Sequence, residues 1–259
     1  NLGSLERTQT LEPRIQYLHI PFENQNDIPL FDTAEPDFNI SRVFAENRFI
    51  GADRLNDARR FAFGLTSRFL RNDNGQETLL LQLAQAIDTV TPQVEINNST
   101  SRRRRSEIIF TSLYRPTNQW RANAEFHWDS AENSIVRSAM QLGYTSESGM
   151  ILNFGYRRRI TPEKLEQGDF SFVYPISQQW RAVGRWNYSL REAATLESIA
   201  GLEFENCCYS TRFVVRRFRE PGSGELENRL FFELELRGLT AIGNRIENIL
   251  ERGILGYQR

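Results

Sequence analysis

The sequence predicts an all-β protein, an antiparallel transmembrane β-barrel to which this chain contributes about twelve strands. Three observations support that fold class. Apolar and polar residues alternate with a period of two in many segments of the chain. Most of these segments run for about 9–12 residues, the length of a tilted strand that crosses a membrane. Short turns alternate with longer polar links, as they do at the two rims of an outer-membrane barrel.

Composition alone favours a soluble globular protein. The 259 residues carry a formal net charge of −1 and a mean hydropathy of −0.52. No apolar run approaches the ~18 residues of a spanning helix. Because the charges are balanced, the chain has no overall positive potential that would attract nucleic acid. Only one of the 32 basic residues, Lys164, is a lysine. The opening NLGSLERTQT has no charged-then-apolar signal segment, so the chain is either cytosolic or an internal fragment of a longer precursor.

Alternation identifies the strands in order along the chain. The clearest is WRANAEFHWD, in which every second residue from Trp120 to Trp128 is apolar. WRAVGRWNYSL and RLFFELELRG repeat that pattern, RFAFGLTSRFL keeps it except at Ser67, and TRFVVRRF and ILNFGYRRR alternate less cleanly. We expect strands near 8–19, 59–70, 77–88, 105–115, 119–129, 134–145, 150–160, 168–175, 179–190, 195–205, 208–218 and 227–237.

The links between these strands divide into two classes. Tight turns are expected near 71–76, 116–118, 146–149, 176–178 and 206–207. Longer polar links are expected near 20–58, 89–104, 161–167 and 219–226, and short links in the same phase near 130–133 and 191–194. Because outer-membrane barrels have their short turns on the periplasmic side, the final strand would end at the periplasmic rim.

The two parities of these strands would meet different solvents. A charged side chain in hydrocarbon costs a few kcal/mol, so the faces rich in Trp, Phe, Leu and Ala would point to lipid. The opposite parity would line an aqueous interior, and its expected lumen-facing residues are Arg121, Asn123, Glu125, Arg181, Arg185, Glu233 and Glu235. A large soluble β-sandwich is the alternative. An open sheet of this size leaves two bare edges, so the strands close on themselves or others outside this chain complete the ring.

The only two cysteines, Cys207 and Cys208, are adjacent in the turn expected near 206–207. Adjacent residues close only a strained ring, outside ordinary disulfide geometry. Alternation would send their side chains apart, so each would reach a different partner, and those partners must lie outside this chain. The turn belongs to the short-link rim, which is periplasmic and oxidising. Two unpaired thiols are the alternative, whereas a metal site lacks its remaining ligands.

Four segments resemble, in order, the LptD family of lipopolysaccharide-assembly proteins: LEPRIQYLHIPFENQNDIPLFD, SRVFAENRFIGADRLNDARRFAFGLTSRFL, GLEFENCCYSTRFVVRRF and NRLFFELELRGL. The most specific pieces are the LEPRxQYL opening, the aromatic-Gly-x-Asp-Arg segment around Phe49–Arg54, the CCY turn and the closing ELRGL. The resemblance covers essentially the whole chain. It implies that residues 1–237 form the C-terminal part, roughly the last half, of a larger barrel, with residues 238–259 as a periplasmic tail.

The resemblance also implies a function, a location and partners. Such a barrel, in the outer membrane of Gram-negative bacteria, would translocate lipopolysaccharide and insert it into the outer leaflet. The sugar portion would pass through a polar lumen, and lipid A would leave through a lateral gate where the last strand meets the first strand of the barrel. Implied partners are a plug lipoprotein (LptE) in the lumen, periplasmic bridge proteins, and the missing jelly-roll and early strands of the same protein. Cys207 and Cys208 would bond to cysteines of the N-terminal region.

Two other functions remain as alternatives from the residues alone: a general outer-membrane porin or transporter, and a secreted β-sandwich binding module. We expect no enzyme, because the chain has no Gly-x-Ser-x-Gly elbow and no acid–base set. His19 and His127 are isolated in the sequence, with no nucleophile spaced around either. No cofactor and no metal are expected.

Three further segments carry weaker signals. The arginines of TSRRRRSE would lie in a solvated outer-rim loop and are a candidate contact for lipopolysaccharide phosphates, with a nucleic-acid patch as the alternative. They are Arg102, Arg103, Arg104 and Arg105. Asp53 and Arg54, in FIGADRL, would belong to a structured external loop folded over or into the lumen. Apolar residues at helical spacing in NRIENILERGIL indicate a short amphipathic helix or a periplasmic extension.

Overall fold

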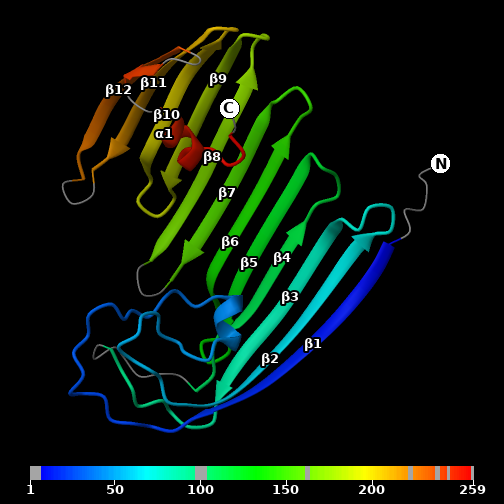
Figure 1. The fold of residues 1–259 in the computed structure, drawn as a ribbon, viewed down its shortest axis with the longest axis vertical. Helices are drawn as coiled ribbons and strands as arrows, with labels where there is room; N and C mark the ends of the chain where they lie inside the picture. Colours follow the sequence, from blue (N-terminus) through cyan, green and yellow to red (C-terminus); the bar gives the residue numbers. More distant parts are fainter. Residues whose placement is uncertain are drawn as a thin grey trace. The chain divides into compact units, whose positions relative to one another are not determined.

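A computed structural model describes residues 7–96, 104–160, 164–220, 224–236, 240–243 and 246–257. These residues form an all-β, antiparallel fold, which confirms the predicted class (Figure 1). In the part of the chain described, no helix combines the length and the apolar character of a membrane span. The elements are β1 (Arg7–Ile20), η1 (Ile40–Phe44), β2 (Ala58–Arg71), β3 (Glu77–Asp88), β4 (Ile108–Tyr114), β5 (Trp120–Asp129), β6 (Ser134–Thr145), β7 (Ile151–Arg159), β8 (Leu165–Pro175), β9 (Trp180–Ser189), β10 (Ala194–Glu205), β11 (Tyr209–Arg219), β12 (Leu226–Leu236), β13 (Thr240–Gly243) and α1 (Glu247–Gly253).

The strands follow one another in the sheet in chain order, from β1 to β13. This topology follows from the links, because antiparallel neighbours can be joined by tight turns whereas parallel ones need a long crossover. The predicted limits of the twelve long strands agree closely with the structure. The largest differences are at β4 and β8, which begin at Ile108 and Leu165. β8 starts earlier than its alternation indicates because the ladder with β7 continues to the pair Arg159 and Leu165.

β13 was not expected from the sequence. It pairs antiparallel with the end of β12, from Leu236 opposite Thr240 to Glu233 opposite Gly243. Four residues are too few for alternation to identify a strand. The strand predicted near 227–237 is therefore not the last strand of the sheet. At its end near the short turns, Glu233–Leu236 already pair with β13.

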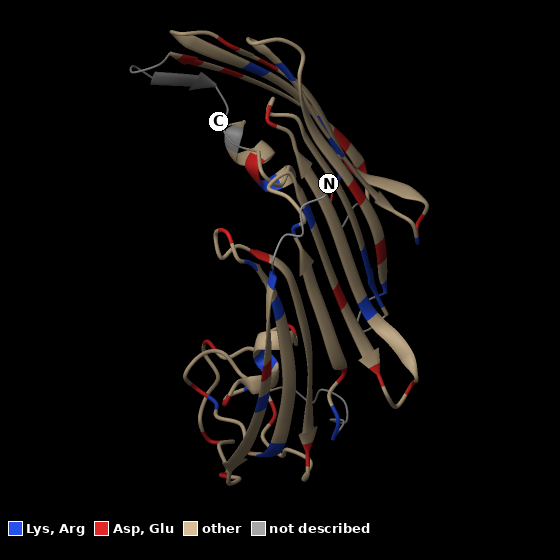
Figure 2. Ribbon diagram, turned by 90° about the vertical axis from the view of Figure 1, so that its right-hand side faces the viewer, with Lys and Arg blue, Asp and Glu red and all other residues tan. Residues whose placement is uncertain are grey.

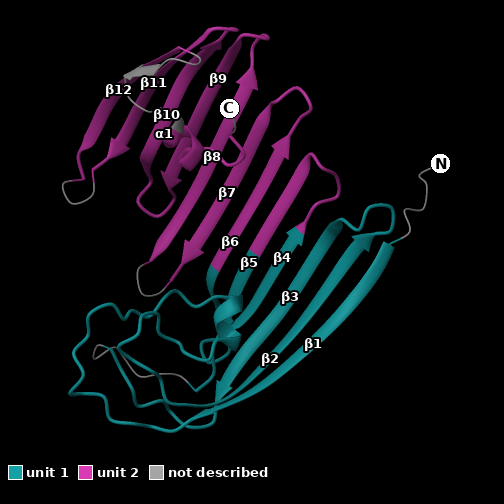
Figure 3. Cartoon of the chain, viewed as in Figure 1, with its two compact units in different colours: residues 1–113, 125–137 teal, residues 114–124, 138–259 magenta. Residues whose placement is uncertain are grey.

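The chain forms two compact units, and β5 and β6 contribute residues to both (Figure 3). Unit 1 contains residues 1–113 and 125–137, and unit 2 contains residues 114–124 and 138–259. In both, charged residues recur along the strands and are not confined to the links (Figure 2). Such charges need a polar or paired environment on one face of the sheet.

In unit 1, the link between β1 and β2 folds back onto one face of β2, β3 and β4. Small residues on these strands make room for it: a Cβ added to Gly64 would lie 2.6 Å from the Phe44 ring. The resulting core joins η1 to the sheet and consists of Val43, Ala62, Ala84, Ala86 and Ile109, with Phe38, Ile40 and Phe44 packed against it. The link is therefore structured and packed on the sheet, as expected for the segment that contains FIGADRL.

Asp53 and Arg54 explain why that link holds its shape. The Asp53 carboxylate accepts backbone N–H groups of Phe31 and Asp32, each at 2.8 Å. These two N–H donors, Asp32 first, hold the pKa of Asp53 below its ordinary value. The nearly buried Arg54 guanidinium donates to the carbonyl oxygens of Ile28 and Gln25. An adjacent acid and base thus tie together two stretches of the link that are far apart in sequence.

In unit 2, α1 and the residues after it pack on one face of the sheet. α1 confirms the predicted short amphipathic helix, and Leu250 within it and Ile246 and Ile254 at its two ends are fully buried. They cover a row of residues that lie directly opposite one another across β7 to β12: Ile151, Val173, Val183, Gly201, Val214 and Phe231. An apolar row thus crosses a face that is otherwise polar.

Candidate functional site

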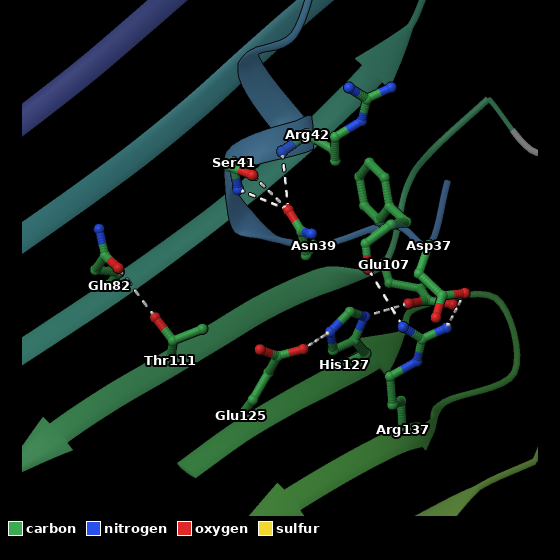
Figure 4. Close-up of polar contacts among 11 residues, drawn as sticks. Asp37, Asn39, Ser41, Arg42, Gln82, Glu107, Thr111, Glu125, His127 and Arg137 are labelled. Atoms are coloured by element: carbon green, nitrogen blue, oxygen red, sulfur yellow. Dashed lines mark hydrogen bonds and ion pairs between the residues drawn. The ribbon is translucent and has the colours of Figure 1, made fainter. Parts of the chain in front are cut away.

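A polar cluster in unit 1 centres on His127, whose side chain is fully buried (Figure 4). Its Nδ1 lies 2.6 Å from Oε2 of Glu107, which precedes β4, and its Nε2 lies 2.7 Å from Oε1 of Glu125 on β5. An imidazole that carries a proton on both nitrogens donates to both carboxylates. The sequence indicated that His127 is isolated, but the structure gives it two carboxylate neighbours, because strand register brings Glu107 beside it.

Arg137 of β6 lies close enough to Glu125 of the cluster for their charges to interact, and it also contacts the folded-back segment. Its Nη2 lies 3.6 Å from Oδ1 of Asp37, and its Nη1 donates to the carbonyl oxygen of Phe38 at 3.4 Å (Figure 4). Asn39 then caps η1, because its Oδ1 accepts the backbone N–H groups of Ser41 and Arg42. Polar contacts and the apolar core thus hold residues 37–44 on the same sheet face.

The geometry of the His127 cluster suits a clamp that joins β5 to the residue before β4. The two carboxylates occupy opposite ring nitrogens, so they do not converge on one point as metal ligands do. Among the described residues, no group of three or more His, Cys, Asp or Glu side chains is arranged to hold a metal ion. Both contacts of the imidazole are to carboxylates and neither is to a hydroxyl or thiol nucleophile.

A row of alternating charges crosses four strands of unit 2. Arg181, Glu203, Arg212 and Glu233 lie directly opposite one another on β9, β10, β11 and β12. Successive side chains approach to 3.1, 3.4 and 3.3 Å. The central members Glu203 and Arg212 are 2% and 3% exposed, so each needs its neighbours to offset the loss of hydration.

A second group of ion pairs lies on the same face, nearer the long links. Arg185 lies 2.8 Å from Asp169 and 2.9 Å from Glu197, and Arg216 lies 2.6 Å from Glu197. The apolar row described above separates this group from the row that contains Arg212. The predicted residues Arg181, Arg185 and Glu233 therefore share one face with Glu235, which lies 3.6 Å from Arg212.

The C-terminal segment 246–257 closes onto this face through polar contacts at both ends. The Ile246 N–H donates to Oε2 of Glu233 at 3.0 Å, and Asn153 Nδ2 donates to the carbonyl oxygen of Leu255 at 3.0 Å. The buried Tyr257 hydroxyl donates to Glu203. Burial, together with the Glu203 carboxylate, raises the pKa of Tyr257 above its ordinary value. The segment and the charge row are thus one connected structure.

The remaining lumen-facing predictions are divided between the units. Glu125 belongs to the His127 cluster in unit 1. In unit 2, Asn123 Nδ2 lies 3.5 Å from Oε1 of Gln141, and Arg121 is exposed. Sequence reasoning missed Glu107, Glu203, Arg212 and Tyr257. Leu202 and Phe204 on either side could have marked Glu203 as polar-facing, but TRFVVRRF alternates less cleanly around Arg212, and only register shows that the two residues meet.

Cys207 and Cys208 lie in the turn between β10 and β11, and both are exposed. Their Sγ atoms are 2.7 Å apart, so the expectation that the two side chains diverge is wrong. The reason is that both residues lie in the bend closed by the Asn206 N–H to Tyr209 carbonyl bond, outside the pleated strands. The Cys207 thiol, through its hydrogen bond, raises the pKa of Cys208. Bonding to cysteines elsewhere stays a prediction.

The arginine run is only partly described. Arg102 and Arg103 lie outside the described residues. Arg104 and Arg105 are exposed, and the bridge between Ile87 and Arg105 extends the β3 edge toward them. Contact of these side chains with lipopolysaccharide phosphates stays a prediction.

Comparison with known proteins gives one consistent result. The family model described as LptD, LPS transport system D, matches residues 1–180. The LPS-assembly protein LptD of Xanthomonas campestris pv. campestris (strain 8004) is 37% identical over 263 residues, which cover 96% of this chain and 32% of that protein. The LPS-assembly protein LptD of Xylella fastidiosa (strain 9a5c) is 36% identical over 256 residues, with the same coverage. The chain thus spans about a third of the length of these curated relatives.

Proposed function

Because this chain belongs to the LptD family, we propose that it forms the C-terminal part of an outer-membrane barrel that translocates lipopolysaccharide and inserts it into the outer leaflet. The relatives are named as LPS-assembly proteins, and the antiparallel all-β fold agrees with a barrel that crosses the outer membrane with strands. The work is transport of a lipid and requires no enzymatic step from these residues.

The observation that carries the proposal is the contrast between the two faces of the sheet. One face of each unit holds paired charges, the His127 cluster in unit 1 and the Arg212 row in unit 2. The opposite parity exposes large apolar side chains on nearly every strand of unit 2: Phe154, Trp180, Trp186, Leu202, Phe213, Val215, Leu230 and Phe232. That amount of exposed apolar surface is unfavourable in water and favourable in hydrocarbon.

The polar face would line the lumen and solvate the sugar portion of the substrate. The folded-back segment and residues 246–257 both lie on this face in their own units, so the lumen would be partly filled by the chain itself. In the complete protein a plug lipoprotein would occupy further space, and periplasmic bridge proteins would deliver the substrate. Residues 238–259 would then reach the lumen side from the periplasmic rim.

The lateral gate would lie at the edge of β12. β13 pairs only with Glu233–Leu236, so residues Leu226–Phe232 keep an edge without a partner in the described part of the chain. The first strand of the complete barrel would pair with that edge weakly enough for acyl chains to leave sideways. The edge of β1 would pair with the preceding strand of the same protein.

The two cysteines would tie this barrel to the N-terminal region. Their exposure in a turn at the short-link rim leaves both thiols accessible, and the periplasm is oxidising. Mass spectrometry of the full-length protein under non-reducing conditions tests this role. Cys207 and Cys208 recovered as free thiols from mature protein would contradict it.

The function is tested by depleting the full-length protein in a Gram-negative host and measuring lipopolysaccharide at the cell surface. Depletion should stop the appearance of new lipopolysaccharide in the outer leaflet, and re-expression should restore it. Normal surface delivery during depletion, combined with loss of small-solute uptake, would favour a general porin instead. Release of the protein from membranes by carbonate alone would favour a secreted β-sandwich module.

A further inference from the structure

We propose that the outward face of unit 2, at the long-link ends of β7, β8 and β9, binds the phosphorylated headgroup of a lipopolysaccharide molecule in the surrounding outer leaflet. We call this surface the Lys164 patch; its members are Arg158, Lys164, Arg191, Tyr156, Tyr188 and Leu190. The site would hold a resident lipid on the outside of the barrel and is separate from any transport path. Its assignment to the outer leaflet rests on the proposed function.

The patch combines three cations at neighbouring ends of three adjacent strands, one on a strand and two in the links. Arg158 is near the end of β7, Lys164 immediately precedes β8, and Arg191 follows β9. Arg191 Nη1 donates to the Lys164 carbonyl oxygen at 2.7 Å, which places those two residues side by side. Two strand spacings amount to about 10 Å, a width that a sugar headgroup with two phosphates can bridge.

These cations lack the internal partners that the inward arginines have. All three side chains are exposed, and none forms an ion pair with a described residue. The nearest carboxylate across the ladder is Glu166, opposite Arg158. It accepts the Tyr156 hydroxyl at 2.9 Å instead. By contrast, inward arginines of the same unit meet carboxylates: Arg181, Arg185, Arg212, Arg216 and Arg229.

Below the cations lies an aromatic surface of the kind found at membrane interfaces. Arg158 shares its face with Tyr156 and with Phe154, which is 52% exposed. On β9, Trp186 is 51% exposed, and its ring centroid is 5.4 Å from that of Tyr188. Aromatic girdles mark the two edges of the apolar band in outer-membrane barrels. The cations therefore stand where headgroups lie and the rings where acyl chains begin.

The charge arrangement favours a phosphate ligand over water alone. Arginine forms paired charge-assisted hydrogen bonds with phosphate oxygens, and lysine adds a compact positive charge. A zwitterionic headgroup would offer only one anionic group, accompanied by a cation. Phosphatidylglycerol offers one phosphate without the width to reach all three side chains. The patch therefore fits a phosphorylated glycolipid best.

Lys164 provides a specific probe, because it is the only lysine among these 259 residues. The full-length protein in nanodiscs would be acetylated with a water-soluble amine reagent, and the peptide that contains Lys164 would be quantified by mass spectrometry. Nanodiscs would contain phosphatidylcholine with added lipopolysaccharide, dephosphorylated lipopolysaccharide or phosphatidylglycerol. We expect lipopolysaccharide alone to slow acetylation of Lys164 strongly.

The matched variants are Arg158→Gln combined with Arg191→Gln, and Arg217→Gln as a control. The double change should weaken protection by lipopolysaccharide about tenfold or more, because it removes both arginine contacts to phosphate. Arg217 is also exposed, but it lies on β11 outside the patch, so its change should leave protection intact. Heat-modifiable gel mobility would verify that each variant is folded.

Three outcomes would overturn the proposal: no protection by lipopolysaccharide, equal protection by phosphatidylglycerol or by the dephosphorylated form, or undiminished protection in the double variant. This binding measurement involves no transport. A protein that still delivers lipopolysaccharide to the surface but shows no protection would refute the patch alone. Failure of surface delivery to depend on the protein would refute the proposed function instead.

Discussion

Replacement of Leu250 by Ala should release the C-terminal segment from the sheet of unit 2. Leu250 is fully buried against the apolar row, in a cluster to which six strands contribute. Loss of a buried Leu side chain costs about 3 kcal/mol where the surroundings cannot collapse into the space. Since a factor of ten corresponds to about 1.4 kcal/mol, the open population of the segment should rise on the order of 100-fold.

Hydrogen exchange reads that population directly. The Ile254 and Tyr257 N–H groups are bonded to the carbonyl oxygens of Leu250 and Ile254, so both are protected only while the segment keeps its fold. Exchange in the C-terminal peptide of the full-length protein should accelerate on the order of 100-fold in Leu250→Ala. The matched control is Leu255→Ala, because Leu255 lies in the same segment but is 42% exposed.

The control should change the exchange rate by no more than about threefold, the range of an ordinary surface substitution. Unchanged exchange in Leu250→Ala would refute the argument that burial of this residue holds the segment. An equal acceleration in both variants would also refute it, because the effect would then not depend on burial.

Three further predictions concern the charge row of unit 2 and the β1–β2 link of unit 1. Arg212→Ala should lower the free energy of unfolding by about 3–5 kcal/mol, because Glu203 and Glu233 stay buried without their cation. The control Arg229→Ala, at an exposed ion pair, should lower it by less than about 1 kcal/mol. Denaturant titration in micelles measures both variants, and equal effects would contradict the role of burial. Gly64→Ala should displace η1, because the new Cβ would lie 2.6 Å from the Phe44 ring. Proteolysis near residues 40–44 should become faster. A link that stays resistant to protease would show that Phe44 does not pack against Gly64. Asp53 stabilises the β1–β2 link in its ionised form, and its pKa is lowered from 3.8, so its contribution is present above that pH and is lost as the pH falls through the lower folded value. Pepsin cleavage beside the exposed Phe31 should therefore rise as the pH falls below 3.8 in the unchanged protein and show no such step in Asp53→Asn. Parallel profiles would exclude Asp53 as the cause.

Alternation along the chain determined most of the fold in advance. The twelve long strands, their order through short turns and the division into two faces all depend on neighbours in sequence. The same local pattern identified Arg181, Arg185 and Glu233 as members of the polar face. The helical spacing of Ile246, Ile249, Leu250 and Ile254 indicated a short helix as one of two interpretations for the same reason, because periodicity is a property of one segment.

Only the tertiary structure decided which side chains meet. Glu107 reaches His127, and Arg212 lies between Glu203 and Glu233, because of the register between strands. A different register would give each residue a different partner and leave the alternation within each strand unchanged. The short β13, the docking of residues 246–257 and the approach of the two thiols likewise depend on packing or on bend geometry. Period-two alternation states which face a residue occupies; the partner on that face is set by contacts between segments that are distant in sequence.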